Sequence, residues 1–150
     1  MNEIQWGRST EDLAISISVP EPVYKPGDAI VLSISLKNIG RTPVPIVVRS
    51  TWIDYATTVR YEDGTEVPKT EYALQMMEAA QEGRRLTREL MPEEVLTESL
   101  ELSKAFEMTQ AGTYTVVATR ATYKRGKLDE YATVTSNELT FKVVPKDNDQ

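Results

Sequence analysis

The sequence of 150 residues contains no cysteine and no histidine. Without cysteine the chain has no disulfide and no thiolate nucleophile, and without histidine it has no imidazole base. The cysteine and histidine sites that bind structural zinc are excluded for the same reason. These absences remove the most common catalytic designs, including the serine–histidine pair. They leave the compartment open, because exported bacterial proteins and cytosolic proteins can both do without cysteine.

The sequence also lacks a long hydrophobic run and an excess of basic residues. No apolar stretch approaches the ~20 residues that a membrane-spanning helix needs, so we expect no transmembrane segment. Seventeen Lys and Arg against 23 Asp and Glu give a net charge of −6, which disfavours nucleic acid as a partner. Met1–Trp6 has neither the basic head nor the apolar centre of a signal peptide. Localisation is left open, with an exported protein slightly favoured over a cytoplasmic one.

The composition that is present is ordinary for a globular domain, with 40% apolar and 27% charged residues. The clearest pattern lies in Ala29–Asn38, where more polar residues separate Ile30, Leu32, Ile34 and Leu36. Alternation with a period of two predicts a strand with one buried face. Pro26-Gly27, just before this run, predicts the turn that leads into it.

Similar alternation predicts further strands along the chain. The strongest candidates are Leu13–Val19 and Thr113–Tyr123. Shorter or less regular candidates are Ile46–Val48, Tyr55–Glu62, Leu86–Leu90, Leu96–Leu102 and Tyr131–Val144. Asp63-Gly64 predicts a hairpin turn after one of them. Strands separated by turns in this way favour two packed antiparallel sheets, with a small barrel as the alternative.

One segment breaks the strand pattern and predicts a helix. Glu71–Ala80 consists of good helix formers with hardly a β-branched residue. Thr70 is suited to cap the N-terminus of this helix and Gly83 to follow its C-terminus. Tyr72 or Ala73, together with Met76, Ala79 and Ala80, would form the stripe that lies on the sandwich.

Three short motifs resemble those of bacterial immunoglobulin-like modules and macroglobulin-type domains. The run Pro22–Asp28 resembles their Pro-Val-Tyr-Lys-Pro-Gly-Asp entry to the second strand, and Gly112–Val116 resembles the Gly-Thr-Tyr-Thr opening of a late strand. Leu90–Glu94 is similar to their Leu-x-Pro-Gly-Glu turn, with Glu93 where glycine is usual. In outline the chain also resembles the intracellular proteinase inhibitors of bacilli, although no inhibitory loop is evident.

The pattern and the resemblance together predict an all-β fold: an immunoglobulin-like antiparallel β-sandwich of about seven to nine strands with one inserted short helix. We expect residues 1–12 to be a flexible N-terminal arm, residues 13–144 the sandwich, and residues 145–150 a disordered tail. In such a domain Tyr114 is a candidate tyrosine corner, whose hydroxyl group bonds to the backbone upstream.

The candidate binding residues are aromatic or methionine side chains. Trp52, Tyr55 and Tyr61 could form an exposed platform for a sugar or a peptide, because planar rings offer large contact area at low entropy cost. The alternative is that Tyr55 and Tyr61 belong to the core, since they share a strand face with Val59. Met76 and Met77 could adapt to the surface of a partner, or could fill the domain's own core.

No catalytic residue, metal site or cofactor is predicted. The carboxylates around Asp63 match no EF-hand spacing, and the Asp63-Gly64 pair is explained by the turn itself. The pair Glu93 and Glu94 could serve glycoside chemistry, but no aromatic cleft accompanies it in the sequence.

The sequence therefore predicts a non-catalytic binding or structural module. Its partner would be a protein, with carbohydrate as a second possibility. The working surface would be either the end that carries Trp52 and the Asp63-Gly64 turn or the helical insert Thr70–Gly83, because the fold itself does not require these segments. The alternative is a proteinase inhibitor that acts through a hairpin loop.

Overall fold

The first sheet is built around β3 (Val31–Asn38), which has β1 (Leu13–Ser18) on one side and β7 (Val95–Glu101) on the other. The computed structural model describes residues 4–146, and within them both pairings are antiparallel. The apolar residues of β3 point inward: Leu32, Ile34 and Leu36 are fully buried. The alternating apolar residues of this strand thus form one wall of the core, as the sequence pattern predicted.

The second sheet is organised by β8 (Gly112–Lys124), the longest strand. Its first half pairs with β5 (Ala56–Arg60) and β10 (Leu139–Val143), and its second half pairs with β9 (Lys127–Thr135). The short β2 (Val23–Tyr24) adds to β10 in parallel. Because β5 begins at Ala56, which pairs with Thr119, the second half of β8 continues without β5 as a neighbour.

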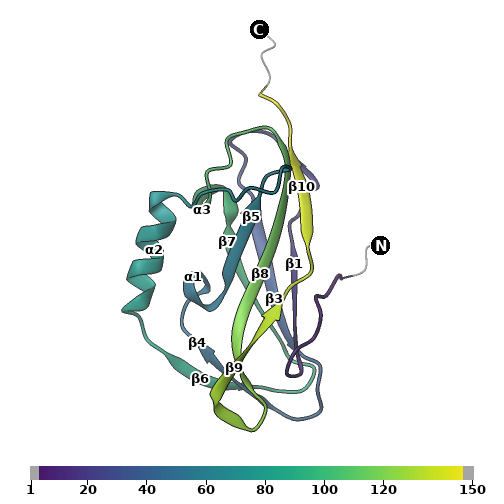
Figure 1. Cartoon of the computed structure of the whole chain (residues 1–150), viewed down its shortest axis with the longest axis vertical. Coiled ribbons are helices and arrows are strands. Elements are labelled where there is room, and N and C mark those ends of the chain that lie inside the picture. Colours follow the sequence, from purple (N-terminus) through teal and green to yellow (C-terminus); the bar gives the residue numbers. More distant parts are fainter. Residues whose placement is uncertain (1–3, 147–150) are drawn as a thin grey trace.

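A separate two-stranded ribbon lies near this extension of β8. It consists of β4 (Val44–Val48) and β6 (Leu86–Leu90), paired antiparallel. Figure 1 shows the ribbon and the β8–β9 hairpin at the end of the molecule opposite the C-terminus. Pro45 lies within β4, which a two-stranded ribbon tolerates because each strand has a free edge.

Within residues 4–146, three helices connect these strands. The predicted helix is present as α2 (Glu71–Gln81), and the Thr70 hydroxyl accepts a hydrogen bond from Ala73 N at 3.1 Å, as expected for its N-cap. The predicted stripe is present through Ala73, Met76 and Ala80, which are buried or half-buried. It differs at Ala79, which is exposed, and at Met77, which is half-buried. The single turns α1 (Thr51–Asp54) and α3 (Leu102–Ala105) complete the set.

The predicted fold class is confirmed: the chain is an immunoglobulin-like, antiparallel β-sandwich. The described residues form ten strands rather than about seven to nine. The difference arises because Tyr131–Val144 is divided into β9 and β10, and because the two-residue β2 was not predicted. The link that carries Trp52 is the helical turn α1, capped by Ser50.

Aromatic side chains close one end of the core. The ring of Phe141 lies 5.7 Å from that of Tyr24 and 5.8 Å from that of Tyr114. The hydroxyl group of Tyr114 donates to Gln110 O at 2.5 Å. This is the predicted tyrosine corner, and it fixes the chain at the entry to β8.

Residues 4–12, assigned from the sequence to a flexible arm, lie against β1. Gly7 N donates to Ile15 O at 2.9 Å, and the Ser16 hydroxyl donates to Gln5 O at 2.6 Å. A Cβ atom on Gly7 would lie 2.1 Å from Thr135 O, so only glycine fits at this crossing. Of the predicted tail 145–150, residues 147–150 lie outside the described residues.

The turn between β6 and β7 contains one strained residue. Glu94 N donates to Met91 O at 2.9 Å across the turn. Pro92 and Glu93 are its central residues, and Glu93 has φ = 70°. This conformation costs a residue with a Cβ about 1–2 kcal/mol relative to glycine. In the turn motif that this segment resembles, glycine is usual at this position. The positive φ of Glu93 explains that preference, because glycine adopts this conformation without strain.

Replacing Glu93 with glycine is expected to stabilise the fold. Relief of the strain is offset in part by the greater entropy of glycine in the unfolded chain and by loss of the exposed contact with Lys37. We expect a net gain of about 0.5–1 kcal/mol, measured by urea unfolding. Glu93→Ala removes the same contact and keeps the Cβ, so an equal gain in that variant would contradict this explanation.

Candidate functional site

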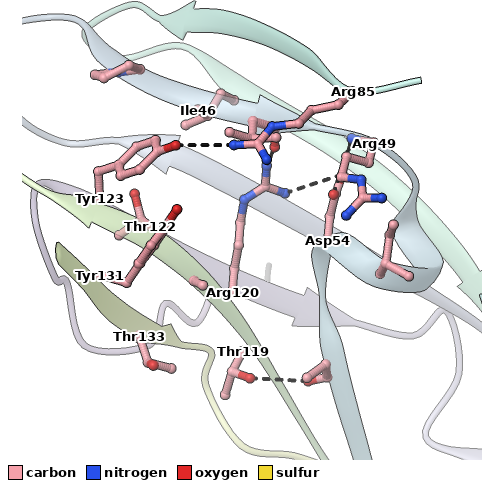
Figure 2. Close-up of a pocket in the computed structure, with 15 residues that line it drawn as sticks. Ile46, Arg49, Asp54, Arg85, Thr119, Arg120, Thr122, Tyr123, Tyr131 and Thr133 are labelled. Atoms are coloured by element: carbon pink, nitrogen blue, oxygen red, sulfur yellow. Dashed lines mark hydrogen bonds and ion pairs between the residues drawn. The ribbon is translucent and has the colours of Figure 1, made fainter. Parts of the chain in front are cut away.

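A large pocket lies between the β4–β6 ribbon and the β8–β9 hairpin. Its volume is about 400 Å³, and we call it the arginine pocket after Arg49, Arg85 and Arg120 in its lining. The remaining lining residues are Pro45–Val47, Ile53, Asp54, Ala56, Thr119, Ala121–Tyr123, Tyr131 and Thr133. Figure 2 shows Arg85 and Arg120 entering the pocket from opposite walls.

Arg120 is the most deeply buried charged residue of the pocket. Its side chain is 3% exposed, and it follows Val116 and Ala118 on the inner face of β8. Nη2 donates to Val47 O at 2.5 Å, and the guanidinium group lies 5.0 Å from the centre of the Tyr55 ring. Nη1 has no hydrogen-bond partner among the described residues.

Asp54 provides the negative charge that accompanies Arg120. Its side chain is 4% exposed, and Oδ2 lies 3.9 Å from Arg120 Nη1. Both carboxylate oxygens also accept from the backbone N of Arg49, at 3.0 and 3.2 Å. Asp54 ends α1, so the Ser50 cap that starts this turn places the carboxylate beside the guanidinium group.

The other two arginines approach from the ribbon side. Arg49 Nη2 donates to Gln81 O at 3.0 Å, whereas its Nε is buried without a partner in the described structure. Arg85 Nη2 donates to the Tyr123 hydroxyl group at 3.2 Å. The Tyr123 ring stacks on Tyr131, with centroids 4.9 Å apart. Three guanidinium groups and one carboxylate therefore give the lining a net charge of +2, in a chain whose net charge is −6.

A second, smaller pocket of about 130 Å³ brings together three of the predicted binding residues: Trp52, Tyr55 and Met77. Tyr55 is 3% exposed, and burial raises the pKa of its hydroxyl group to about 12. The hydroxyl groups of Tyr55 and Thr57 are buried without hydrogen-bond partners in the part of the chain described. The Trp52 ring meets the edge of Tyr72 at 6.0 Å.

The remaining predicted residues lie elsewhere. Tyr61 follows β5 and packs on Tyr114, with ring centroids 5.6 Å apart. Met76 is half-buried on α2 and is not part of either lining. Since Tyr55 is buried and Tyr61 packs at the tyrosine corner, the three aromatic rings do not share one exposed surface.

Sequence reasoning missed the arginine pocket. Arg49, Arg85 and Arg120 were not among the predicted binding residues. One local indication was available: Arg120 occupies the inward position of an otherwise apolar alternation in Thr113–Tyr123. A charged residue there suggests a buried ion pair or a pocket.

The described residues contain no group of three or more His, Cys, Asp or Glu side chains that could hold a metal ion. The carboxylates near the Asp63-Gly64 turn serve the backbone instead, since Glu62 Oε1 accepts from Thr113 N at 2.8 Å. Hydrogen bonds from Thr65 lower the pKa of Asp63. Nowhere in residues 4–146 is there a helix with the length and hydrophobicity to span a membrane.

No family model matches the sequence, and no curated protein matches it. Solved structures that resemble it include the C-terminal domain of Wzt, with 10% identity, 95% of this chain and 78% of that chain covered, and a TM-score of 0.55. A CARDB domain from Pyrococcus furiosus, solved with di-metal ions, has 20% identity, coverage of 89% and 88%, and a TM-score of 0.44. AvmM, described as catalysing macrocyclization in alchivemycin A biosynthesis, has 10% identity, coverage of 97% and 98%, and a TM-score of 0.46.

At these identities the similarity concerns the fold. It agrees with an immunoglobulin-like sandwich and does not single out the macroglobulin type.

Asp54→Asn tests the buried pair. The substitution keeps an acceptor for Arg49 N but leaves the guanidinium group of Arg120 without its carboxylate, so we expect a loss of about 3 kcal/mol in the free energy of unfolding. The matched control is Glu66→Gln in the exposed pair with Arg60, where we expect less than about 0.5 kcal/mol. Equal effects in the two variants would show that burial of the Asp54 pair is energetically unimportant.

Two tyrosine-to-phenylalanine variants test the hydroxyl groups. Tyr114→Phe loses the bond to Gln110 O, and we expect it to cost about 1 kcal/mol. Tyr55→Phe removes a buried hydroxyl group that has no partner among the described residues, so its stability at pH 7 should be unchanged or higher.

The same Tyr55→Phe variant should resist alkali better. The unfolded chain ionises this group near pH 10 and the folded chain near pH 12, so wild-type stability is lost across this range. Denaturant unfolding from pH 7 to 11 measures both effects, and a Tyr55→Phe protein as alkali-sensitive as the wild type would count against the assignment.

Proposed function

We propose that this chain is a non-catalytic binding module and that its ligand binds in the arginine pocket. The observation that carries the proposal is the guanidinium group of Arg120, which is buried in the wall of a 400 Å³ pocket and whose Nη1 has no hydrogen-bond partner among the described residues. Buried polar groups in folded proteins are nearly always hydrogen-bonded. A ligand in the pocket would provide the missing acceptor.

The chemistry of the lining supports binding rather than catalysis. Asp54 is the carboxylate of the lining, and it is already engaged by Arg120 and by the backbone N of Arg49. A hydrogen bond with Tyr123 raises the pKa of Tyr131, and desolvation is a second, smaller cause in the same direction. The phenol of Tyr131 therefore remains neutral near pH 7. The pocket thus offers hydrogen-bond donors and a ring face, without an activated nucleophile.

The proteinase-inhibitor alternative receives less support from the hairpin loops. Arg125, at the tip of the β8–β9 hairpin, is a basic residue that a trypsin-like cleft would accept. Its Nη1 lies 3.6 Å from Asp12 Oδ2, and its Nη2 donates to Thr42 Oγ1 at 2.6 Å. The loop is therefore tied to the body of the domain instead of projecting from it.

A binding screen with matched variants tests the proposed function. The purified chain is applied to glycan and peptide arrays as wild type, as Arg85→Ala and as Arg84→Ala. Arg84 is the neighbouring exposed arginine and is not part of the lining, so it controls for a general change of charge. We expect a ligand that is retained by Arg84→Ala and bound at least 10-fold more weakly by Arg85→Ala.

Two results would overturn the proposal. One is a ligand bound equally well by Arg85→Ala, which would place binding elsewhere. The other is chemical conversion of the ligand by the wild-type chain. Mass spectrometry of the ligand would detect this conversion, and it would show catalysis.

A further inference from the structure

The arginine pocket is built for an acidic group. Resting on the proposed function, we propose that its ligand is an acidic sugar unit of a glycan, with its carboxylate or phosphate among the three arginines and its ring against Tyr131. This inference names the ligand class of the site, whereas the proposed function requires only that the site binds.

The first argument is electrostatic. The lining carries a net charge of +2, whereas the whole chain carries −6. The net charge of the pocket is therefore opposite in sign to that of the protein as a whole. Guanidinium groups in a concave, poorly solvated wall attract anions more strongly than the same groups on an open surface. Arginine is also the side chain best suited to hold a carboxylate or a phosphate through paired N–H donors.

The second argument is the number of unused donors. Arg120 Nη1 lies 3.9 Å from Asp54, too far for a hydrogen bond, and is buried without a partner in the described structure. Arg49 Nε is also buried without a hydrogen-bond partner among the described residues. The carboxylate of the lining, Asp54, faces the Arg120 guanidinium group and accepts from the backbone N of Arg49. Glu98, which also acts on Tyr55, accepts from the Thr51 hydroxyl group at 2.5 Å through Oε1, whereas its Oε2 has no partner among the described residues. An anionic oxygen in the pocket would satisfy donors that the chain itself leaves open.

The third argument is size and shape. A pocket of about 400 Å³ is much larger than an inorganic anion and is within the range of small-molecule sites. Tyr131 is 59% exposed and stacks on Tyr123, so it presents a supported, flat ring at the pocket. Thr119, Thr122 and Thr133 add hydroxyl groups to the lining. Arginines for the acid, a ring for the sugar face and hydroxyl groups for the sugar hydroxyls together fit an acidic sugar better than an acidic peptide.

The test uses three probes that share a glucose ring: glucuronic acid, glucose 6-phosphate and glucose. Binding to the 15N-labelled chain is followed by chemical-shift titration, with a glutamate-rich peptide as the competing ligand class. We expect glucuronic acid, glucose 6-phosphate or both to shift Arg120 and Tyr131 signals and to bind at least 10-fold more tightly than glucose. The two acidic probes distinguish a carboxylate from a phosphate ligand.

The variants locate the contact. Arg85→Gln should weaken binding of the acidic sugar at least 10-fold, Arg85→Lys should weaken it less because the charge remains, and Arg84→Gln should bind as the wild type does. Tyr131→Ala should weaken binding of the acidic sugar more than binding of inorganic phosphate, which needs no ring face. Higher salt should weaken binding of the acidic probes, because their attraction to the arginines is screened.

The failure of this inference differs from failure of the proposed function. Equal binding of glucose and the acidic sugars, both reduced by Arg85→Gln, would overturn the acidic ligand and leave the binding module intact. Binding of the glutamate-rich peptide without the sugars would likewise replace the ligand class. If no array ligand and no probe bound in a way that depends on Arg85, both the proposed function and the acidic-sugar ligand would be overturned.

Discussion

Arg120 joins β8 to two consecutive elements, β4 and α1, that are far from it in the sequence. It stands on β8, donates to Val47 O on β4 and faces Asp54 at the end of α1. Removing such charges from water costs several kcal/mol per ion unless partners are in place, so this contact constrains where the β4–β6 ribbon and α1 lie relative to the sheet. The pocket exists because the ribbon is held here, beside the part of β8 that extends beyond β5.

The two ends of the sandwich therefore differ in character. At one end, Tyr24, Tyr114 and Phe141 pack ring against ring and exclude water. Toward the other end, the inner face of β8 changes from Val116 and Ala118 to Arg120. Both ends contribute hydrophobic stabilisation, because Val44, Ile46 and Leu90 of the ribbon are also buried. A rigid sheet that carries polar groups at one end is a suitable support for binding, since the groups are positioned before a ligand arrives.

Much of the architecture follows from local pattern. The strand at Val31–Asn38, the helix capped by Thr70 and the tyrosine corner at Tyr114 were predicted, because each depends on residues that are close in the sequence. The turn at Glu93 was also recognised, and its positive φ shows that a backbone requirement persists without the usual glycine. The first residues were harder to interpret, since the fit of Gly7 against Thr135 O appears only when β1 and β9 are assembled.

The sequence by itself determined the alternation that makes two sheets, the helical insert and the absence of imidazole and thiol chemistry. It grouped Tyr55 with Trp52 and Tyr61 as a binding platform, with the core as the alternative for Tyr55 and Tyr61. It did not place Met77 beside Trp52 and Tyr55, because that depends on how α2 and α1 pack. Only the tertiary structure brought Arg49, Arg85 and Arg120 into one lining. The physical reason is that strand alternation is a property of neighbouring residues, whereas a pocket depends on the relative position of segments joined by long loops.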